Sequence, residues 1–250
     1  MKLVITGATG WVGTEVVRQA LRNPAVTSIV ALGRNPTSIP KNSGPNASKL
    51  QSVILDDWTS PYPEAVQTAI AGADGCIWCL AVAPSESKEM PFEDVTRVCS
   101  EYTLHALSSI AATANVPFRF IYASGVFVER DQSKTNLPFL EDYMLMRGRV
   151  ENAILAFAHE NAPKVQAAVT KPGAIDSPDR PAAGFPNVPG PLRSLFRSTP
   201  PPHGTGRVHL SELAATMIDQ CVNGVTKDPL WGEDCARIGK QVLKAEDYLP

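Results

Sequence analysis

The residues with the clearest chemical meaning are three glycines spaced three apart near the start of the chain, Gly7, Gly10 and Gly13. A short apolar run, residues 3–5, leads into them, and apolar residues at helical intervals follow over residues 12–21. A strand, a glycine turn and a helix in this order form a phosphate-binding site, because backbone N–H groups at the helix start face the anion and glycines let the main chain approach it. An ordinary strand-to-helix turn is the alternative. The pattern predicts a bound dinucleotide, held by Gly7, Thr9, Gly10, Trp11, Val12 and Gly13.

The end of the second apolar run, residues 28–32, indicates which dinucleotide the site takes. A site for the unphosphorylated nicotinamide cofactor usually carries Asp or Glu there, bonded to the ribose 2′-hydroxyl. This chain has Gly33, Arg34 and Asn35 instead. The planar guanidinium fork of Arg34 suits a phosphate, and no carboxylate is nearby in sequence to repel one. We therefore expect NADP(H), with a solvated arginine at a strand end as the alternative.

Composition excludes several classes of partner. The chain has 250 residues, 44% of them hydrophobic and 19% charged, which is typical of a globular protein. A formal net charge of −2 gives no reason to expect nucleic acid or an anionic membrane surface, and no apolar stretch approaches the roughly 20 residues of a membrane helix.

Five cysteines, an odd number, favour free thiols in a reducing cytoplasm. Cys76 and Cys79 have the spacing of a metal knuckle, but no second pair accompanies them. Because they lie in an apolar run, we expect a buried core strand here and no metal site.

Strand-like and helix-like segments alternate through the first 170 residues, which predicts an α/β fold of βαβ units around a parallel sheet. The expected strands are Lys2–Ile5, Ser28–Leu32, Ser52–Leu55, Cys76–Leu80, Phe118–Ala123 and Val165–Thr170. The expected helices are Val12–Leu21, Pro63–Ile70, Phe92–Ala114, Phe139–His159 and, later in the chain, Val208–Val222.

Two stretches interrupt this alternation. Residues 35–49 are rich in Pro, Ser and Asn and predict a surface loop. Residues 176–206 are rich in proline and lack a helical or strand period, which predicts a substrate lid or wall, or else a disordered segment. Apolar residues within it favour a small hydrophobic carbonyl compound as substrate: Phe185, Leu192, Leu195 and Phe196.

Beyond the glycine turn, further segments follow one another as they do in a known family. They comprise residues 55–58, 79–81, 120–125, 171–174 and 208–214. With these segments, the chain resembles the atypical and extended short-chain dehydrogenases/reductases, and residues 143–151 are similar to those of the small Tat-interacting-protein-like oxidoreductases. The resemblance implies one domain over residues 1–250, a doubly wound parallel sheet (Rossmann fold) with a small C-terminal substrate-binding region.

The same resemblance implies further cofactor contacts. Asp57 corresponds to the acidic residue that meets the adenine, and Leu80 and Ala81 to the strand end beside the ribose. Pro172 and Gly173 correspond to the turn whose backbone holds the nicotinamide amide.

The family's acid catalyst is a Tyr-x-x-x-Lys pair, whose spacing places both side chains on one helix face. A positive charge beside the phenol lowers its pKa. The matching residues are Tyr143 and Arg147, so the lysine is replaced by arginine. Ser124 corresponds to the serine that binds the substrate oxygen, unless the register places that position at Gly125 or Val126.

Together these features predict an NADP(H)-dependent oxidoreductase acting on a small, apolar carbonyl or alcohol. A cofactor-binding regulatory protein without turnover, or an isomerase or epimerase on the same scaffold, is the alternative. The expected partner is a small-molecule substrate, without nucleic acid or membrane, in the cytoplasm; the sequence does not indicate an oligomeric state.

Overall fold

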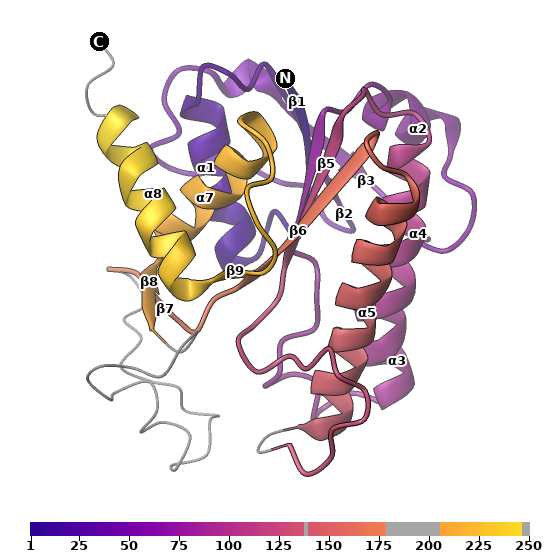
Figure 1. Cartoon of the computed structure of the whole chain (residues 1–250). Coiled ribbons are helices and arrows are strands. Elements are labelled where there is room, and N and C mark those ends of the chain that lie inside the picture. Colours follow the sequence, from indigo (N-terminus) through magenta and orange to yellow (C-terminus); the bar gives the residue numbers. More distant parts are fainter. Residues whose placement is uncertain (138–139, 179–205, 247–250) are drawn as a thin grey trace.

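A seven-stranded sheet forms the centre of the computed structural model of the chain (Figure 1), which describes residues 1–137, 140–178 and 206–246. Its strands run in the order β3-β2-β1-β4-β5-β6-β9, and every neighbouring pair is parallel. The strands are β1 (Lys2–Thr6), β2 (Ser28–Gly33), β3 (Leu50–Ile54), β4 (Gly75–Trp78), β5 (Phe118–Ala123), β6 (Val165–Lys171) and β9 (Leu230–Trp231). The strand order reverses between β1 and β4, so the chain has the predicted doubly wound Rossmann fold.

Helices cover both faces of this sheet (Figure 1). One layer consists of α1 (Trp11–Arg22), α7 (Leu210–Val222) and α8 (Gly232–Glu246). The other consists of α2 (Glu64–Ile70), α3 (Phe92–Thr96), α4 (Tyr102–Ala111) and α5 (Glu141–Glu160). A π-helical turn, Arg97–Glu101, joins α3 to α4, and Ala47–Lys49 forms a 3-10 turn before β3.

The sheet is buried on both faces because its strands are short and almost wholly apolar. Leu3 and Ile5 point into the core beneath α1 and α7, whereas Val4 points into the core beneath α4 and α5. All three side chains are fully buried. This alternation gives two separate cores, one on each face of the sheet.

The expected elements all form, with small differences at their ends, except that the π-helical turn Arg97–Glu101 interrupts the single helix expected over Phe92–Ala114. The strand expected to reach Leu80 ends at Trp78, where Gly7 lies against the main chain of Cys79 and Leu80. The helix expected from Val208 begins at Leu210, because Val208 pairs with Ile175 in a small parallel sheet.

That small sheet, of β7 (Ala174–Asp176) and β8 (Arg207–His209), was not expected from the sequence, nor were β9 and α8. The loop expected over residues 35–49 is confirmed apart from the 3-10 turn at its end. Residues 138–139 and 179–205 lie outside the described residues, and with them the expected start of a helix at Phe139 and nearly all of the predicted lid, including its apolar residues Phe185, Leu192, Leu195 and Phe196.

The cysteines confirm the expected core strand. Cys76 lies in β4 and is fully buried, whereas Cys79 follows the strand and is half-buried. Burial raises the pKa of the Cys79 thiol to about 12 and that of Cys76 well above its usual range. Neutral thiols of this kind are poor metal ligands and poor nucleophiles.

Candidate active site

The glycine turn between β1 and α1 is built by close main-chain contacts. Gly7 has a φ of +64°, and a Cβ placed on it would lie 2.6 Å from the carbonyl carbon of Cys79. A Cβ on Gly13 would lie 2.1 Å from the oxygen of Gly7. The N–H of Gly10 donates to that same oxygen at 2.9 Å. The spacing of three therefore has a steric cause: neither Gly7 nor Gly13 has room for a side chain.

A cavity of about 1060 Å³ opens at the amino end of α1, and Thr9, Gly10 and Trp11 form one of its walls. Residues 40–42 and the start of α7 line it as well. The first turn of α1 carries no acidic residue, and Glu15, which also lines the cavity, is paired with Arg18. Main-chain N–H groups at a helix start, glycines without side chains and a cavity beside them fit the pyrophosphate of a dinucleotide.

Arg34 and Asp57 lie where β2 and β3 end, at the same edge of the sheet, since Gly33 pairs with Ile54. Arg34 is exposed and forms no ion pair with any carboxylate that the structure describes. The Asp57 carboxylate accepts hydrogen bonds from Thr59 and Ser60, and these bonds, with that of the Ser60 hydroxyl foremost, lower the pKa of Asp57. Arg34 is therefore free for an anion, whereas the Asp57 side chain closes its own turn.

The ends of β5 and β6 bring two of the predicted segments together. The N–H of Ser124 donates to the oxygen of Thr170 at 2.9 Å, and the N–H of Val126 donates to that of Pro172 at 3.1 Å. The turn of Pro172 and Gly173 therefore lies directly beside Ser124. Leu80 and Ala81 follow β4, which pairs with both β1 and β5, so all these segments share one edge of the sheet.

Tyr143 and Arg147 lie on one face of α5 and are almost completely buried, with 4% and 5% of their surface exposed. An Arg147 Nη donates to the Tyr143 hydroxyl at 2.9 Å, and the other Nη donates to the oxygen of Ala123 at 2.8 Å. The Tyr143 hydroxyl in turn donates to the oxygen of Val82 at 2.7 Å. Burial raises the pKa of Tyr143, and the charge of Arg147 acts in the opposite direction. Arg147 thus connects the phenol to the end of β5, one residue before Ser124.

A buried carboxylate next to this pair was missed by the sequence argument. Glu151, four residues after Arg147, is fully buried and accepts a hydrogen bond from the Ser124 hydroxyl at 2.5 Å. Arg130 and Lys171 donate to its other oxygen at 2.6 and 3.2 Å. A signal was present in the sequence, because an i, i+4 spacing places Glu151 on the same helix face as Arg147.

Comparisons with known proteins agree with this geometry. The family model described as NAD(P)H-binding matches residues 7–173, which span the sheet from the glycine turn to the turn after β6. The chain belongs to this NAD(P)H-binding family. The match confirms the predicted resemblance to the atypical short-chain dehydrogenases/reductases and a nicotinamide cofactor, without distinguishing its phosphorylated form.

Individual relatives of this NAD(P)H-binding protein are distant. It is 25% identical to "Protein FMP52, mitochondrial" of Candida albicans over 175 residues, 70% of this chain and 67% of that protein. Two solved structures share its fold: MoeE5 in complex with UDP-glucose and NAD (TM-score 0.63, 16% identity, 98% of this chain and 82% of that one) and vestitone reductase from alfalfa, Medicago sativa (TM-score 0.62, 20% identity, 91% and 75%).

Within the described part of the chain, no helix is both long and apolar enough to cross a bilayer.

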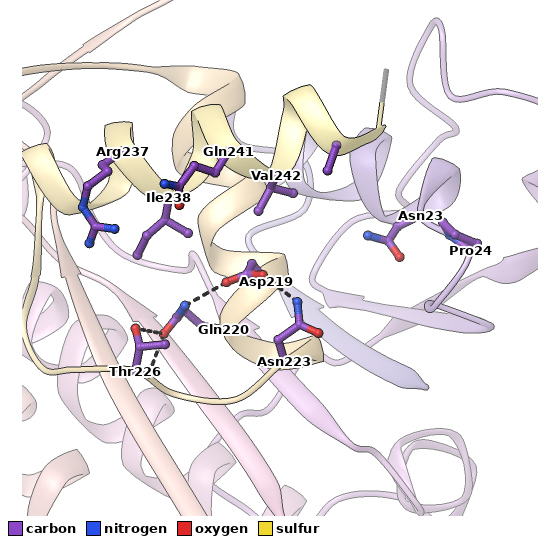
Figure 2. A pocket seen from close by; sticks show the side chains of 11 residues that line it. Asn23, Pro24, Asp219, Gln220, Asn223, Thr226, Arg237, Ile238, Gln241 and Val242 are labelled. Carbon is purple, nitrogen blue, oxygen red and sulfur yellow. Dashed lines mark hydrogen bonds between the residues drawn. The ribbon is translucent and has the colours of Figure 1, made fainter. Parts of the chain in front are cut away.

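A second cavity, of about 570 Å³, lies between α7, α8 and the residues after α1 (Figure 2). Asn23 and Pro24 follow the carboxyl end of α1, so this cavity is far from the carboxyl edge of the sheet, where ligands of such folds bind. Its polar groups bond one another: Gln220 and Asn223 both donate to Asp219 (Figure 2). The first cavity and the Tyr143 region, not this one, make up the candidate active site.

Proposed function

We propose that the protein is an NADP(H)-dependent oxidoreductase that exchanges a hydride with a small, apolar carbonyl or alcohol compound. The observation that carries this proposal is the buried Tyr143–Arg147 pair, which is bonded to the end of β5 at the sheet edge that also holds the glycine turn. A phenol beside a fixed cation at such an edge is suited to moving a proton to or from a substrate oxygen.

The main-chain N–H groups around Gly10 and the α1 terminus would hold the pyrophosphate. Arg34, exposed and without an ion-pair partner among the described residues, would hold the 2′-phosphate. Asp57 would lie beside the adenine. Because its carboxylate is already bonded within its own turn, the contact would come from this part of the chain and not from the carboxylate. Leu80, Ala81, Pro172 and Gly173 would line the ribose and nicotinamide. When bound, the cofactor supplies or accepts the hydride.

Tyr143 would be the proton donor. Arg147 differs from the lysine of related proteins because both of its Nη atoms already have acceptors, the Tyr143 hydroxyl and the Ala123 oxygen. A guanidinium does not lose its proton in proteins. Arg147 would therefore act through its charge, which favours the phenolate, and would not pass protons on.

In this structure the proton of Tyr143 is donated to the oxygen of Val82. Proton delivery requires the substrate oxygen to replace that carbonyl as acceptor. The N–H of Val82 donates to the Cys99 sulfur at 3.4 Å, so both main-chain polar groups of Val82 are hydrogen-bonded. A substrate would have to compete with an existing contact.

Changing Tyr143→Phe tests the proposal. We expect turnover to fall by at least about a hundredfold, because general acid catalysis contributes 10²–10⁴-fold. The Kd for NADPH should change less than about twofold. Tyr122→Phe is the matched control, since Tyr122 is equally buried but its hydroxyl has no hydrogen-bond partner among the described residues. Full turnover by Tyr143→Phe would remove Tyr143 from the mechanism.

The Tyr143–Val82 bond also favours a second candidate, a protein that senses NADP(H) without turnover. In that case the phenol would be a structural link between α5 and the segment after β4. Loss of folding stability in Tyr143→Phe, with no turnover in the wild-type protein against a panel of carbonyl compounds and alcohols, would favour this candidate.

We propose a cytoplasmic location and a small-molecule substrate as the main partner. All five cysteines are free, as expected in a reducing compartment. The relative FMP52 is mitochondrial by its name, so imaging of a fluorescent fusion would decide between the two compartments.

A further inference from the structure

Ser124 has only one proton to donate, and the groups around its hydroxyl indicate which atom accepts that proton. Its hydroxyl oxygen is 2.5 Å from Oε1 of Glu151, which is fully buried. Arg130 and Lys171 both contact the other carboxylate oxygen, Oε2. A carboxylate held by two cations is an acceptor without a proton of its own. The Ser124 hydroxyl must therefore be the donor in this bond.

This bond determines what Ser124 can offer to a ligand. A hydroxyl carries one donor and two acceptor lone pairs. With its proton committed to Glu151, Ser124 has only lone pairs left, and no described residue donates to them. Its side chain is half-buried at the end of β5, beside the turn of Pro172 and Gly173. A ligand oxygen in the site would meet Ser124 as a hydrogen-bond acceptor.

We propose that Glu151 is a positioning residue that fixes Ser124 as an acceptor, so that the site binds an alcohol more tightly than the corresponding carbonyl compound. An alcohol oxygen can accept from the Tyr143 phenol and donate its own proton to Ser124. A carbonyl oxygen has no proton and would face the lone pairs of Ser124. The proposal rests on the proposed oxidoreductase function for its ligand class, but the direction of the Ser124 hydrogen bond can be measured independently.

The contacts of Glu151 suggest a substitution that would make Ser124 a hydrogen-bond donor to the ligand instead of an acceptor. In Glu151→Gln, the amide oxygen would take the place of Oε2 beside the two cations, Arg130 and Lys171. The amide NH₂ would then take the place of Oε1 and donate to Ser124. The Ser124 proton would be released toward the ligand, and the variant should prefer the carbonyl compound.

The test compares two small apolar probes with one skeleton, cyclohexanol and cyclohexanone, in complexes that cannot react. Cyclohexanol is titrated into the NADPH-saturated full-length protein and cyclohexanone into the NADP⁺-saturated protein, and the ratio of the two Kd values is compared between variants. We expect the wild-type ratio to favour the alcohol roughly tenfold, the value of about one hydrogen bond. Ser124→Ala should remove most of this preference and Glu151→Gln should reverse it. Glu93→Gln, which removes a charge from a side chain that is 86% exposed, is the control.

A second measurement needs neither cofactor nor substrate. Neutron diffraction from crystals of the deuterated wild-type protein should show a deuteron on the Ser124 oxygen directed at Glu151. A deuteron directed away from Glu151, or placed on the carboxylate, would overturn the proposal. So would an identical Kd ratio in wild type, Ser124→Ala and Glu151→Gln.

The two measurements also separate this inference from the proposed function. If the protein binds no nicotinamide cofactor, the proposed function fails, and the position of the deuteron alone decides whether Glu151 orients Ser124. If Glu151→Gln does not fold, the Ser124→Ala ratio and the neutron map still decide.

Discussion

Arg147 determines how Tyr143 can act, because it is the charged group bonded to the phenol. A nearby cation lowers the pKa of a phenol, typically by 1–3 units at such distances, and burial raises it. In this structure burial is the larger effect and Arg147 partly offsets it. The phenol is therefore protonated near neutral pH, which is the state that the proposed role as proton donor requires.

Replacing Arg147→Met should raise the pKa of Tyr143 further. Reduction needs the protonated phenol, so the rate of reduction in the variant should begin to fall at a higher pH than in the wild type. Oxidation of the alcohol needs the phenolate, so it should also begin at a higher pH. The shift should be about one pH unit or more in profiles of kcat/KM. Arg147→Lys keeps the charge and is the control. Identical profiles for all three proteins would show that Arg147 does not act on the reacting group.

At the residue scale, the sequence predicted the glycine turn, Arg34 and the Tyr143–Arg147 pair, and the structure places them along one edge of the sheet. It did not predict Glu151, Arg130 and Lys171, because an isolated charged residue in a helix or strand usually points to solvent. Here a buried carboxylate, Glu151, meets the buried Lys171 and the half-buried Arg130 from two other segments, and only the fold brings them together. The site roles of all these residues remain predictions.

At the scale of elements, α5 is held against the loop before it by a glycine. A Cβ on Gly148 would lie 1.6 Å from the oxygen of Glu129. That contact brings the helix close enough for Arg147 and Glu151 to reach the ends of β5 and β6. The helix therefore depends on a residue that would weaken it in isolation.

Gly148→Ala should destabilise the protein by about 2 kcal/mol, because the contact is close enough for overpacking to cost about 3 kcal/mol, and the gain in helix propensity offsets only about 1 kcal/mol of that. Urea unfolding at pH 7 measures this difference. Gly125→Ala is the matched control, since a Cβ there would have no atom within 4 Å. Equal stability of the two variants would contradict the packing described for α5.

The π-helical turn between α3 and α4 also contacts the candidate site. It contains Cys99, whose sulfur accepts from the N–H of Val82, the residue that holds the Tyr143 hydroxyl. Periodicity predicted one helix over Phe92–Ala114 and gave no sign of this turn. Such π-helical turns are rare and occur mostly as single turns inside α-helices, so the helical period of this stretch gave no reason to expect one.

At the scale of the whole molecule, the fold was predictable because its buried parallel strands are apolar runs between amphipathic helices. The strand β9 has two residues, and the small sheet of β7 and β8 has three in each strand, too few for a periodic signal. These late elements are positioned by tertiary contacts: β9 pairs with the end of β6, and β7 with β8.

Buried thiols make stability depend on alkaline pH. Cys76, Cys221 and Cys235 are fully buried, and burial raises the pKa of each, for Cys235 to about 12. An unfolded thiol has a pKa of about 8.5, so this stability is complete below pH 8.5 and is lost as the pH rises toward the folded value. Between pH 8.5 and 10 the free energy of unfolding should fall by about 2 kcal/mol for each such thiol.

Urea unfolding of the wild type and of Cys235→Ala at several pH values checks this expectation. Over the same pH range, the free energy of unfolding of the variant should fall less than that of the wild type, by about the 2 kcal/mol expected for one thiol. A parallel decline of the two proteins would show that Cys235 does not hold its proton in the folded state.

The central claim, that this family member uses a phosphorylated nicotinamide cofactor, is tested most directly by calorimetric titration with NADPH and with NADH at matched ionic strength. We expect NADPH to bind roughly tenfold or more tighter, the value of one charged hydrogen bond or more. The difference should disappear in Arg34→Ala and persist in Arg22→Ala, which removes an exposed arginine at the other end of α1. Equal binding of NADPH and NADH by the wild type would contradict the role of Arg34, and binding of neither would contradict the oxidoreductase function itself.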